Sequence, residues 1–145
     1  MTELQELQAR QELKALVDNY AAESDTDNQD YYVNVFTPDC HVQVYFGEKL
    51  GMDIHNVKDL IAQFKGFGAP EVSFHMNGQQ IVNFEDDSHA SGTCYALAHL
   101  VTTENGVKTL TTHGVRYYYK YIRSDAGWRI SDREQHFVFT NTAAI

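Results

Sequence analysis

The stretch from Val17 to Cys40 contains the first side chains in this sequence whose types and spacing could do chemistry. It predicts the end of one helix, a short acidic turn and a second helix that stops at Pro38. Tyr20 stands five residues before Asp25. A phenol can protonate a departing hydroxyl, and a carboxylate can orient a basic imidazole. A turn aspartate is also a common capping residue and an inward tyrosine a common core residue, so the stretch by itself leaves both interpretations open.

Other motifs for catalysis or metal binding are absent. Seven histidines suggest a metal site, but no pair has i, i+4 helical spacing beside an acid, and Cys40 and Cys94 are isolated. A serine hydrolase would need a Gly-x-Ser-x-Gly nucleophile elbow, which the sequence lacks. No glycine-rich loop could cradle a phosphate. The sequence therefore predicts no metal site and shows neither a nucleophile elbow nor a phosphate-binding loop.

The composition of the 145 residues bounds the class of protein. A hydrophobic content of 43%, with 12% aromatic residues, is enough for a core, and the length predicts one domain over residues 1–145. A net charge of -9 argues against nucleic acid and membrane surfaces, which leaves a small molecule, another protein or the chain itself as partner. There is no transmembrane run and no signal segment after Met1. We therefore expect a cytoplasmic protein in which Cys40 and Cys94 are reduced core thiols.

Three helices are predicted in the N-terminal part of the chain. The first begins with Thr2 and Gln5 in capping-box spacing and continues to Tyr20, which faces inward. The second begins at Asp27, as a cap, and the third begins at Asn56 and ends at a pair of glycines. These helices should position the acidic turn against whatever follows.

The remainder is predicted to form a sheet. His41–Phe46 alternates polar and apolar residues and is expected to be a strand, followed by a loop. From Val72 to Thr140, long β-rich runs separated by three turn clusters predict a four-stranded antiparallel meander. The expected fold is an α+β half-barrel in which three N-terminal helices pack in a curved mixed or antiparallel sheet. Its concave face would suit a small ligand.

Alternation along the strands predicts which side chains share a face. In the third long strand, Tyr117 shares a face with His113 and further tyrosines. In the second, His99 shares a face with Tyr95 and Leu97, and small residues lie opposite. Each aromatic face with its single histidine suits a moderately apolar pocket.

These features resemble the SnoaL-like branch of the nuclear transport factor 2-like superfamily. The resemblance covers nearly the whole chain and rests on Tyr20, Asp25, the Phe36–Asp39 stop, His75 at the opening of the sheet, and the Asp125–Ile130 run. Among catalytic members, the chain is similar to scytalone dehydratase, bile acid 7α-dehydratase and hexachlorocyclohexane dehydrochlorinase. Those enzymes share an aspartate just after the first helix and a histidine at the start of the long sheet.

The resemblance implies that Asp25 and His75 form a catalytic dyad. An imidazole with one nitrogen against a carboxylate is fixed in one tautomer and made more basic, so it can remove a proton next to a carbonyl or leaving group. Tyr20 would be the acid that assists the leaving group. This chemistry requires no metal or organic cofactor.

The resemblance also suggests four substrate-binding residues. His99 aligns with a second active-site histidine of scytalone dehydratase, and Arg133 with an arginine of the dehydrochlorinase, although Arg133 could instead pair with a nearby acid. Tyr45 is one residue out of register with a water-holding tyrosine, and Tyr117 replaces an asparagine. Because Ser24 also replaces a tyrosine of scytalone dehydratase, scytalone itself is not the expected substrate.

Two functions remain open at this point. One is a cofactor-independent lyase or isomerase that acts on a small, largely apolar carbonyl or alcohol compound in a closed pocket. The other is a non-catalytic ligand-binding or assembly module of the same fold. Neither face of the long strands is polar throughout, so we expect a homo-oligomer. The dehydratase-like relatives favour a trimer over a dimer.

Overall fold

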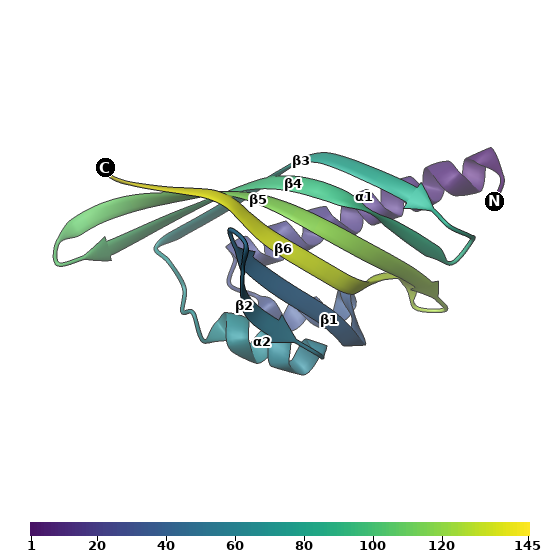
Figure 1. The fold of residues 1–145 in the computed structure, drawn as a ribbon, viewed down its shortest axis with the longest axis horizontal. Helices are drawn as coiled ribbons and strands as arrows, with labels where there is room; N and C mark the ends of the chain where they lie inside the picture. Colours follow the sequence, from purple (N-terminus) through teal and green to yellow (C-terminus); the bar gives the residue numbers. More distant parts are fainter.

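The computed structural model describes residues 1–145 as two α-helices, one 3₁₀ helix and six strands. In chain order they are α1 (Glu3–Asp25), η1 (Gln29–Asn34), β1 (Phe36–Phe46), β2 (Lys49–Ile54), α2 (Val57–Lys65), β3 (Val72–Phe84), β4 (His89–Glu104), β5 (Val107–Ser124) and β6 (Gly127–Ala144). The strands form a twisted sheet, and the helices lie on one side of it (Figure 1). This is the expected α+β class.

Helix α1 begins at the predicted capping box. Thr2 Oγ1 accepts a hydrogen bond from the Gln5 backbone N–H at 3.1 Å, and Gln5 Oε1 accepts one from the Thr2 N–H at 2.9 Å. The buried face of the helix consists of Ala9, Leu13, Val17, Tyr20 and Ala21. Helix α1 packs across β3, so its last residue, Asp25, lies against that strand. No helix has both the length and the apolar character needed to cross a membrane.

The expectation of three N-terminal helices is wrong in part. The second helix is the six-residue 3₁₀ helix η1, and Asp27 is not its cap. Asp27 instead occupies the left-handed region with φ of 59°, and its carboxylate accepts a hydrogen bond from Gln29 Nε2 at 2.7 Å. Helix α2 does begin after Asn56, whose Oδ1 caps the Asp59 N–H at 2.8 Å, but it follows β1 and β2 in the chain.

Strand β1 is longer than predicted, because it begins at Phe36 instead of His41. Phe36 pairs with Ile130 of β6, and the pairing then lapses until His41 meets Asp132. Pro38 lies in this gap, where its missing N–H removes no ladder hydrogen bond. The expected helix stop is therefore a bulge within a strand, and part of the loop expected before Asn56 is β2.

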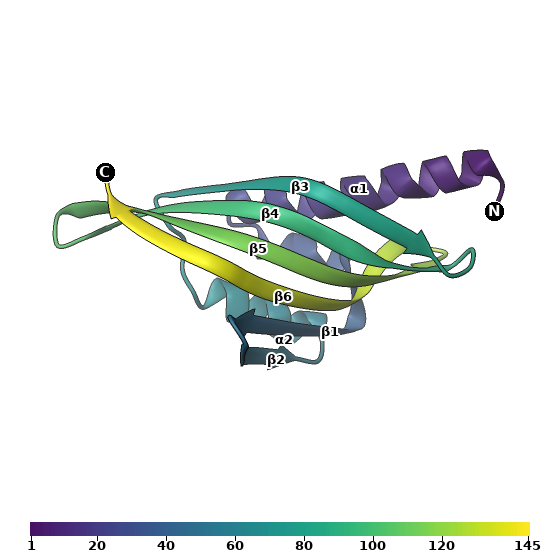
Figure 2. The ribbon, with the colours of Figure 1, turned by 45° about the horizontal axis from the view of Figure 1, so that its top comes forward.

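The sheet has the strand order β2-β1-β6-β5-β4-β3. Strands β1 and β6 are parallel and all other neighbours are antiparallel, so the sheet is mixed. The predicted meander is confirmed as β3 to β6. Figure 2 shows the long strands side by side, with β3 at one edge and β2 at the other.

The inner face of the sheet, which the helices cover, combines large residues on β5 with small ones on β4. Cys94 pairs with Tyr117, and Ala96 is its inward neighbour on β4. The small side chains leave room for three buried rings of β5, those of Tyr117, Tyr119 and Tyr121. Tyr95 and Leu97 consequently point to the outer face of the sheet. The prediction that the aromatic side of β4 lines a pocket on the concave, inner face is therefore wrong.

Both cysteines lie in the core as free thiols, as expected. Cys40 and Cys94 are fully buried and unpaired. Burial raises the pKa of each thiol to about 11, so both stay protonated near neutral pH and act as small apolar side chains.

Candidate active site

Asp25 and His75 are in direct contact between α1 and β3. Asp25 is the last residue of α1, and His75 lies near the start of β3. Nδ1 of His75 is 2.5 Å from Oδ1 of Asp25, although 50 residues separate the two in sequence. The contact is therefore made by packing α1 across the edge strand and not by local sequence.

The Asp25 carboxylate is held by three donors. Besides the imidazole, Ser73 Oγ donates to Oδ1 at 2.9 Å, and the backbone N–H of His75 donates to Oδ2 at 2.9 Å. An ionised carboxylate only accepts hydrogen bonds, so the proton of the neutral imidazole belongs on Nδ1. Nε2 then keeps its lone pair and can accept a proton, which is the arrangement a general base needs.

The dyad is partly exposed to solvent. The His75 side chain is 19% exposed and that of Asp25 is 23% exposed. His113 of β5 lies on the same face of the sheet as His75, because Ala98 pairs with both histidines from the intervening strand. Burial and the charge of His75 lower the pKa of His113, so a second neutral imidazole lies beside the base.

Arg133 of β6 is enclosed by aromatic rings on the same inner face. Its side chain is 1% exposed, and its guanidinium carbon lies 4.7 Å from the ring centroid of Tyr20 and 5.2 Å from that of Tyr117. Phe36 and Phe64 complete the enclosure at 5.1 and 5.8 Å. Such stacking stabilises a desolvated cation by about 2 kcal/mol or more.

The Arg133 guanidinium keeps unused donors inside this aromatic cage. Nη2 donates to Gln135 Oε1 at 3.0 Å, but Nε and Nη1 are buried without a partner. Burial lowers the pKa of Arg133, and the surrounding phenols, Tyr20 first, raise it by more, so the side chain stays charged. Burial also raises the pKa of Tyr117, which keeps that phenol neutral. Two free donors on a buried cation could receive an oxygen or a halide.

Tyr20 belongs with Arg133 and does not touch the dyad. Five residues of α-helix correspond to about 7.5 Å of rise and a rotation of about 140°. The Tyr20 ring accordingly packs on Tyr32, with centroids 4.9 Å apart, while Asp25 turns toward β3. Of the three predicted catalytic residues, the structure thus places Asp25 with His75 and places Tyr20 apart from them, beside Arg133.

Two of the predicted substrate-binding residues lie on the opposite face of the sheet. His75 pairs with Ala98, so the next residue, His99, points outward, where it hydrogen bonds Thr112. Tyr45 also points outward, since its neighbour Val44 is buried, and its ring stacks on His136 at 4.5 Å. Their placement in one pocket with the dyad is wrong, because each is one residue out of phase with the inner face.

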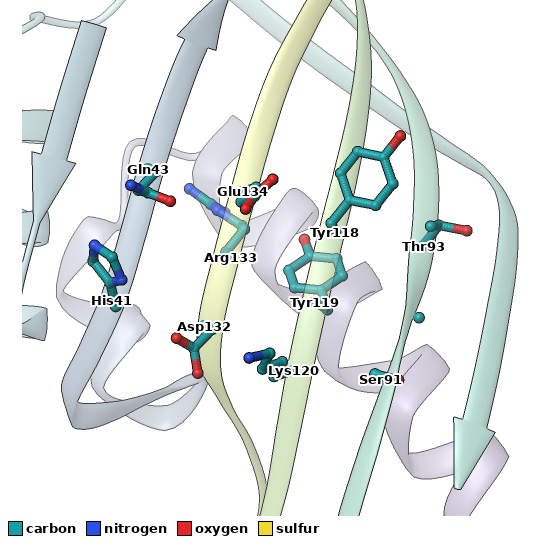
Figure 3. Close-up of a pocket in the computed structure, with 11 residues that line it drawn as sticks. His41, Gln43, Ser91, Thr93, Tyr118, Tyr119, Lys120, Asp132, Arg133 and Glu134 are labelled. Carbon is teal, nitrogen blue, oxygen red and sulfur yellow. The ribbon is translucent and has the colours of Figure 1, made fainter. Parts of the chain in front are cut away.

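The two larger cavities described in the structure also avoid the dyad. One, of about 590 Å³, lies over β1, β6, β5 and β4 and is lined mainly by polar side chains such as His41, Lys120 and Glu134 (Figure 3). The other, of about 360 Å³, is mostly apolar and includes Met76 and Phe139. Neither is lined by Asp25 or His75, so a closed pocket around the dyad remains an expectation.

A sequence profile of the SnoaL-like domain family matches residues 5–134. The chain belongs to this family. A search of curated proteins finds no match to this SnoaL-like domain.

Solved structures similar to this SnoaL-like domain include enzymes. A candidate scytalone dehydratase from Novosphingobium aromaticivorans has a TM-score of 0.82 at 16% identity, over 97% of this chain and 91% of its own. Hexachlorocyclohexane dehydrochlorinase LinA-type3 from Novosphingobium barchaimii has a TM-score of 0.81 at 14% identity, over 98% and 94%. Protein Kfla4162 from Kribbella flavida has a TM-score of 0.78 at 19% identity, over 92% and 93%. At these identities the likeness shows the fold.

Some residues of this site in the SnoaL-like domain were not predicted. Ser73 holds the Asp25 carboxylate, and the amide of Asn77 donates to Asp18 at 2.9 Å and to the Val17 carbonyl at 3.1 Å. Both share a strand face with His75, so the two-residue period of β3 was an available signal. The bond from Ser73 to Asp25 also depends on where α1 ends over β3, which the sequence does not specify.

Proposed function

We propose that this SnoaL-like domain is a cofactor-independent lyase or isomerase of the dehydratase type, with His75 as its general base. The observation that supports this most directly is the fixed imidazole. Its Nδ1 is bound to a carboxylate that Ser73 and a backbone N–H also hold, and its Nε2 is left as an acceptor. A histidine needed only for packing would not require a carboxylate that three hydrogen bonds hold against its Nδ1.

In the proposed reaction, Nε2 of His75 takes a proton from the carbon next to a carbonyl or a leaving group. The electron pair of the C–H bond forms a new double bond or an enolate, and hydroxide or halide departs from the adjacent carbon in the lyase case. Asp25 stabilises the imidazolium that results. In the lyase case the imidazolium then gives its proton to the leaving group or to solvent, and in the isomerase case it protonates another carbon of the enolate, so the enzyme ends unchanged.

Arg133 and Tyr20 are the proposed electrophilic side of the site. The guanidinium has two buried N–H donors without a partner and lies above the Tyr20 ring. These groups would stabilise the negative charge on a substrate oxygen or departing group, which is the part of the reaction that the dyad cannot serve. The aromatic residues around them fit a small, largely apolar carbonyl or alcohol compound.

A non-catalytic ligand-binding or assembly module is the second candidate. It is favoured by the larger cavities, which lie away from the dyad and are bordered by outer-face residues. In that case the Asp25–His75 contact would only fasten α1 to β3. The two candidates differ in whether His75 moves protons of a bound compound.

Proton exchange in D₂O would distinguish the two functions without knowledge of the leaving group. The protein is incubated with a panel of cyclic ketones, β-hydroxy ketones and polychlorinated cyclohexanes, and NMR and mass spectrometry follow deuterium uptake and loss of water or HCl. We expect exchange or elimination with wild type that is lost in His75→Gln and kept in His99→Gln, a matched histidine on the outer face. Equal rates in wild type and His75→Gln would contradict the enzyme assignment.

A further inference from the structure

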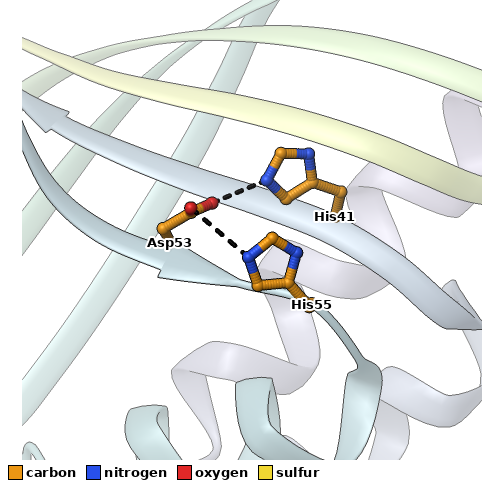
Figure 4. Close-up of side chains that lie close together, drawn as sticks. All are labelled: His41, Asp53 and His55. Atoms are coloured by element: carbon orange, nitrogen blue, oxygen red, sulfur yellow. Dashed lines mark hydrogen bonds and ion pairs between the residues drawn. The ribbon is translucent and has the colours of Figure 1, made fainter.

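A second cluster of histidine and carboxylate lies at the opposite edge of the sheet from the dyad. It consists of His41 on β1, Asp53 on β2 and His55, which directly follows β2 (Figure 4). Val42 of β1 pairs with Ile54 of β2, so the adjacent residues of the two antiparallel chains, His41 and His55, lie opposite each other. Asp53 lies on the same face of the sheet as these two histidines. The sequence shows no such motif because the residues meet only through the β1–β2 register.

The ligand-bearing atoms of the three side chains converge. Nε2 of His41 lies 2.6 Å from Asp53 Oδ1, and Nε2 of His55 lies 3.3 Å from Asp53 Oδ2. All three groups have ligand atoms within 4.8 Å of one another. The two imidazole rings stack with centroids 4.7 Å apart and planes inclined by 10°, and each has its Nε2 edge toward the carboxylate. One ring has to turn out of the stack for both Nε2 lone pairs to point at one ion, and the exposed His55 is free to do so.

These distances are close to what one metal ion requires. Tetrahedral zinc with bonds of about 2.0–2.2 Å places neighbouring ligand atoms about 3.3 Å apart. The separation between His55 Nε2 and Asp53 Oδ2 already has this value. His41 Nε2 lies closer to the other carboxylate oxygen, Oδ1, and these two atoms need to separate by less than about 1 Å when an ion enters between them. The backbone that carries His41 and Asp53 is part of the paired strands β1 and β2, which fixes the relative positions of these two residues, and His55 directly follows β2.

The surroundings also favour a cation. The three side chains are 38%, 43% and 68% exposed for His41, Asp53 and His55, so an ion could reach them from solvent and keep water as a further ligand. Asp132 of β6 pairs with His41 of β1 and adds negative charge to this face. His41 and Asp132 both border the polar cavity of about 590 Å³, which provides room for that water (Figure 3).

We propose that His41, Asp53 and His55 form a binding site for a divalent transition metal ion, with zinc as the best-fitting ion. Two imidazoles and one carboxylate suit zinc, nickel, copper or cobalt better than calcium or magnesium, which prefer oxygen ligands. The ion would cross-link β1 to β2 at this edge of the sheet. The site is independent of the Asp25–His75 dyad, which lies on the other face and on β3 at the far edge.

Titration of the metal-free protein with zinc chloride at pH 7.5, followed by calorimetry, tests the site directly. We expect wild type to bind one equivalent of zinc. The variants His41→Asn and His55→Asn should each bind zinc more weakly by more than about tenfold, since even loss of a group that supports a ligand costs about 10–100-fold in metal affinity. Cobalt added in place of zinc should give the visible absorption of a four-coordinate site. Saturating zinc should raise the Tm of wild type but not that of the His41→Asn/His55→Asn double variant.

A matched control is available in His89, which pairs with Asp86 at 2.9 Å without a third ligand. His89→Asn should leave zinc affinity and stoichiometry unchanged. The proposal is overturned if zinc shows no saturable binding to wild type, or if its affinity is the same in wild type and the His41→Asn/His55→Asn double variant. In either case the cluster is only a hydrogen-bonded clasp between the two strands.

Discussion

The Arg133 guanidinium lies 4.7 Å from the centroid of the Tyr20 ring, in a buried site where no carboxylate balances its charge. Two of its N–H groups have no partner, and each such orphan costs about 1–3 kcal/mol. Stacking on the four rings offsets only part of that cost. This cost is consistent with the proposal that a ligand completes the hydrogen bonds of Arg133.

Replacement of Arg133 should therefore separate stability from function. Arg133→Met keeps an apolar chain of similar length and should raise the free energy of unfolding by about 1 kcal/mol or more, measured by urea titration. Ligand turnover or binding should be lost. Arg133→Lys, the control, keeps the charge without the planar fork and should not be stabilised. A Met variant less stable than wild type by more than 1 kcal/mol would show that the cation serves the fold.

The second prediction concerns the His75 tautomer and needs no substrate. In wild type, ¹⁵N NMR of the imidazole should show the proton on Nδ1, because Asp25 accepts from that nitrogen. Asp25→Asn should remove this preference and, once a substrate is known, reduce turnover by about 10²–10⁴-fold with little change in ligand affinity. Ser73→Ala should have a smaller effect in the same direction. A wild-type imidazole protonated on Nε2 would be incompatible with the proposed base.

The third prediction is a pH dependence that involves His113. Burial and His75 lower its pKa in the folded state, so its contribution to stability is present above the unfolded value of about 6.5 and is lost as pH falls through the folded value. NMR titration should place the His113 transition below that of an unperturbed histidine. In His75→Gln the transition should move upward, because one of the two causes is gone. A His113 transition at or above the usual value in wild type would refute the arrangement.

The sequence predicted the fold class better than the phase of individual strands. The meander and two of the three predicted helix caps, at Thr2 and Asn56, follow from local patterns and are present, whereas the cap predicted at Asp27 is not. Which face of β4 turns inward depends on the volume of the β5 tyrosines opposite, and sequence alternation gives two faces without ranking them. His99 was misplaced for that reason, and Tyr45 on β1 was misplaced because alternation along that strand also gives two faces without ranking them. Pro38 was read as a helix stop because a bulge against β6 is a nonlocal event.

The candidate site was predictable only where the resemblance supplied it. Asp25 and His75 were matched by position, and their contact requires α1 to end over β3, the edge strand of the meander. Nothing local distinguishes Asp25 from Asp27 as a partner for an imidazole. The His41–Asp53–His55 cluster was missed because its residues belong to two strands, one of which was expected to be a loop.

The last prediction is self-association through the outer face of the sheet, with a trimer favoured over a dimer. This face exposes several large apolar side chains along β3, β4 and β6, among them Phe74, Met76, Leu97, Val138 and Phe139. These side chains form one surface across neighbouring strands, since Met76 of β3 pairs with Leu97 of β4 and Phe139 of β6 lies against Gly114 of β5. Apolar surface of this kind commonly marks an interface, and closed symmetry is the usual way to bury it.

Sedimentation equilibrium at micromolar concentration measures the assembly. We expect a mass near three times 16.5 kDa for wild type and a shift toward the monomer in Met76→Glu/Leu97→Glu, which places charge at the centre of the apolar face. Val33→Glu is the matched control, because Val33 is equally exposed but lies on η1, away from the sheet's outer face. A wild-type mass near 16.5 kDa would refute self-association, and a mass near twice that value would retain it but reject the trimer.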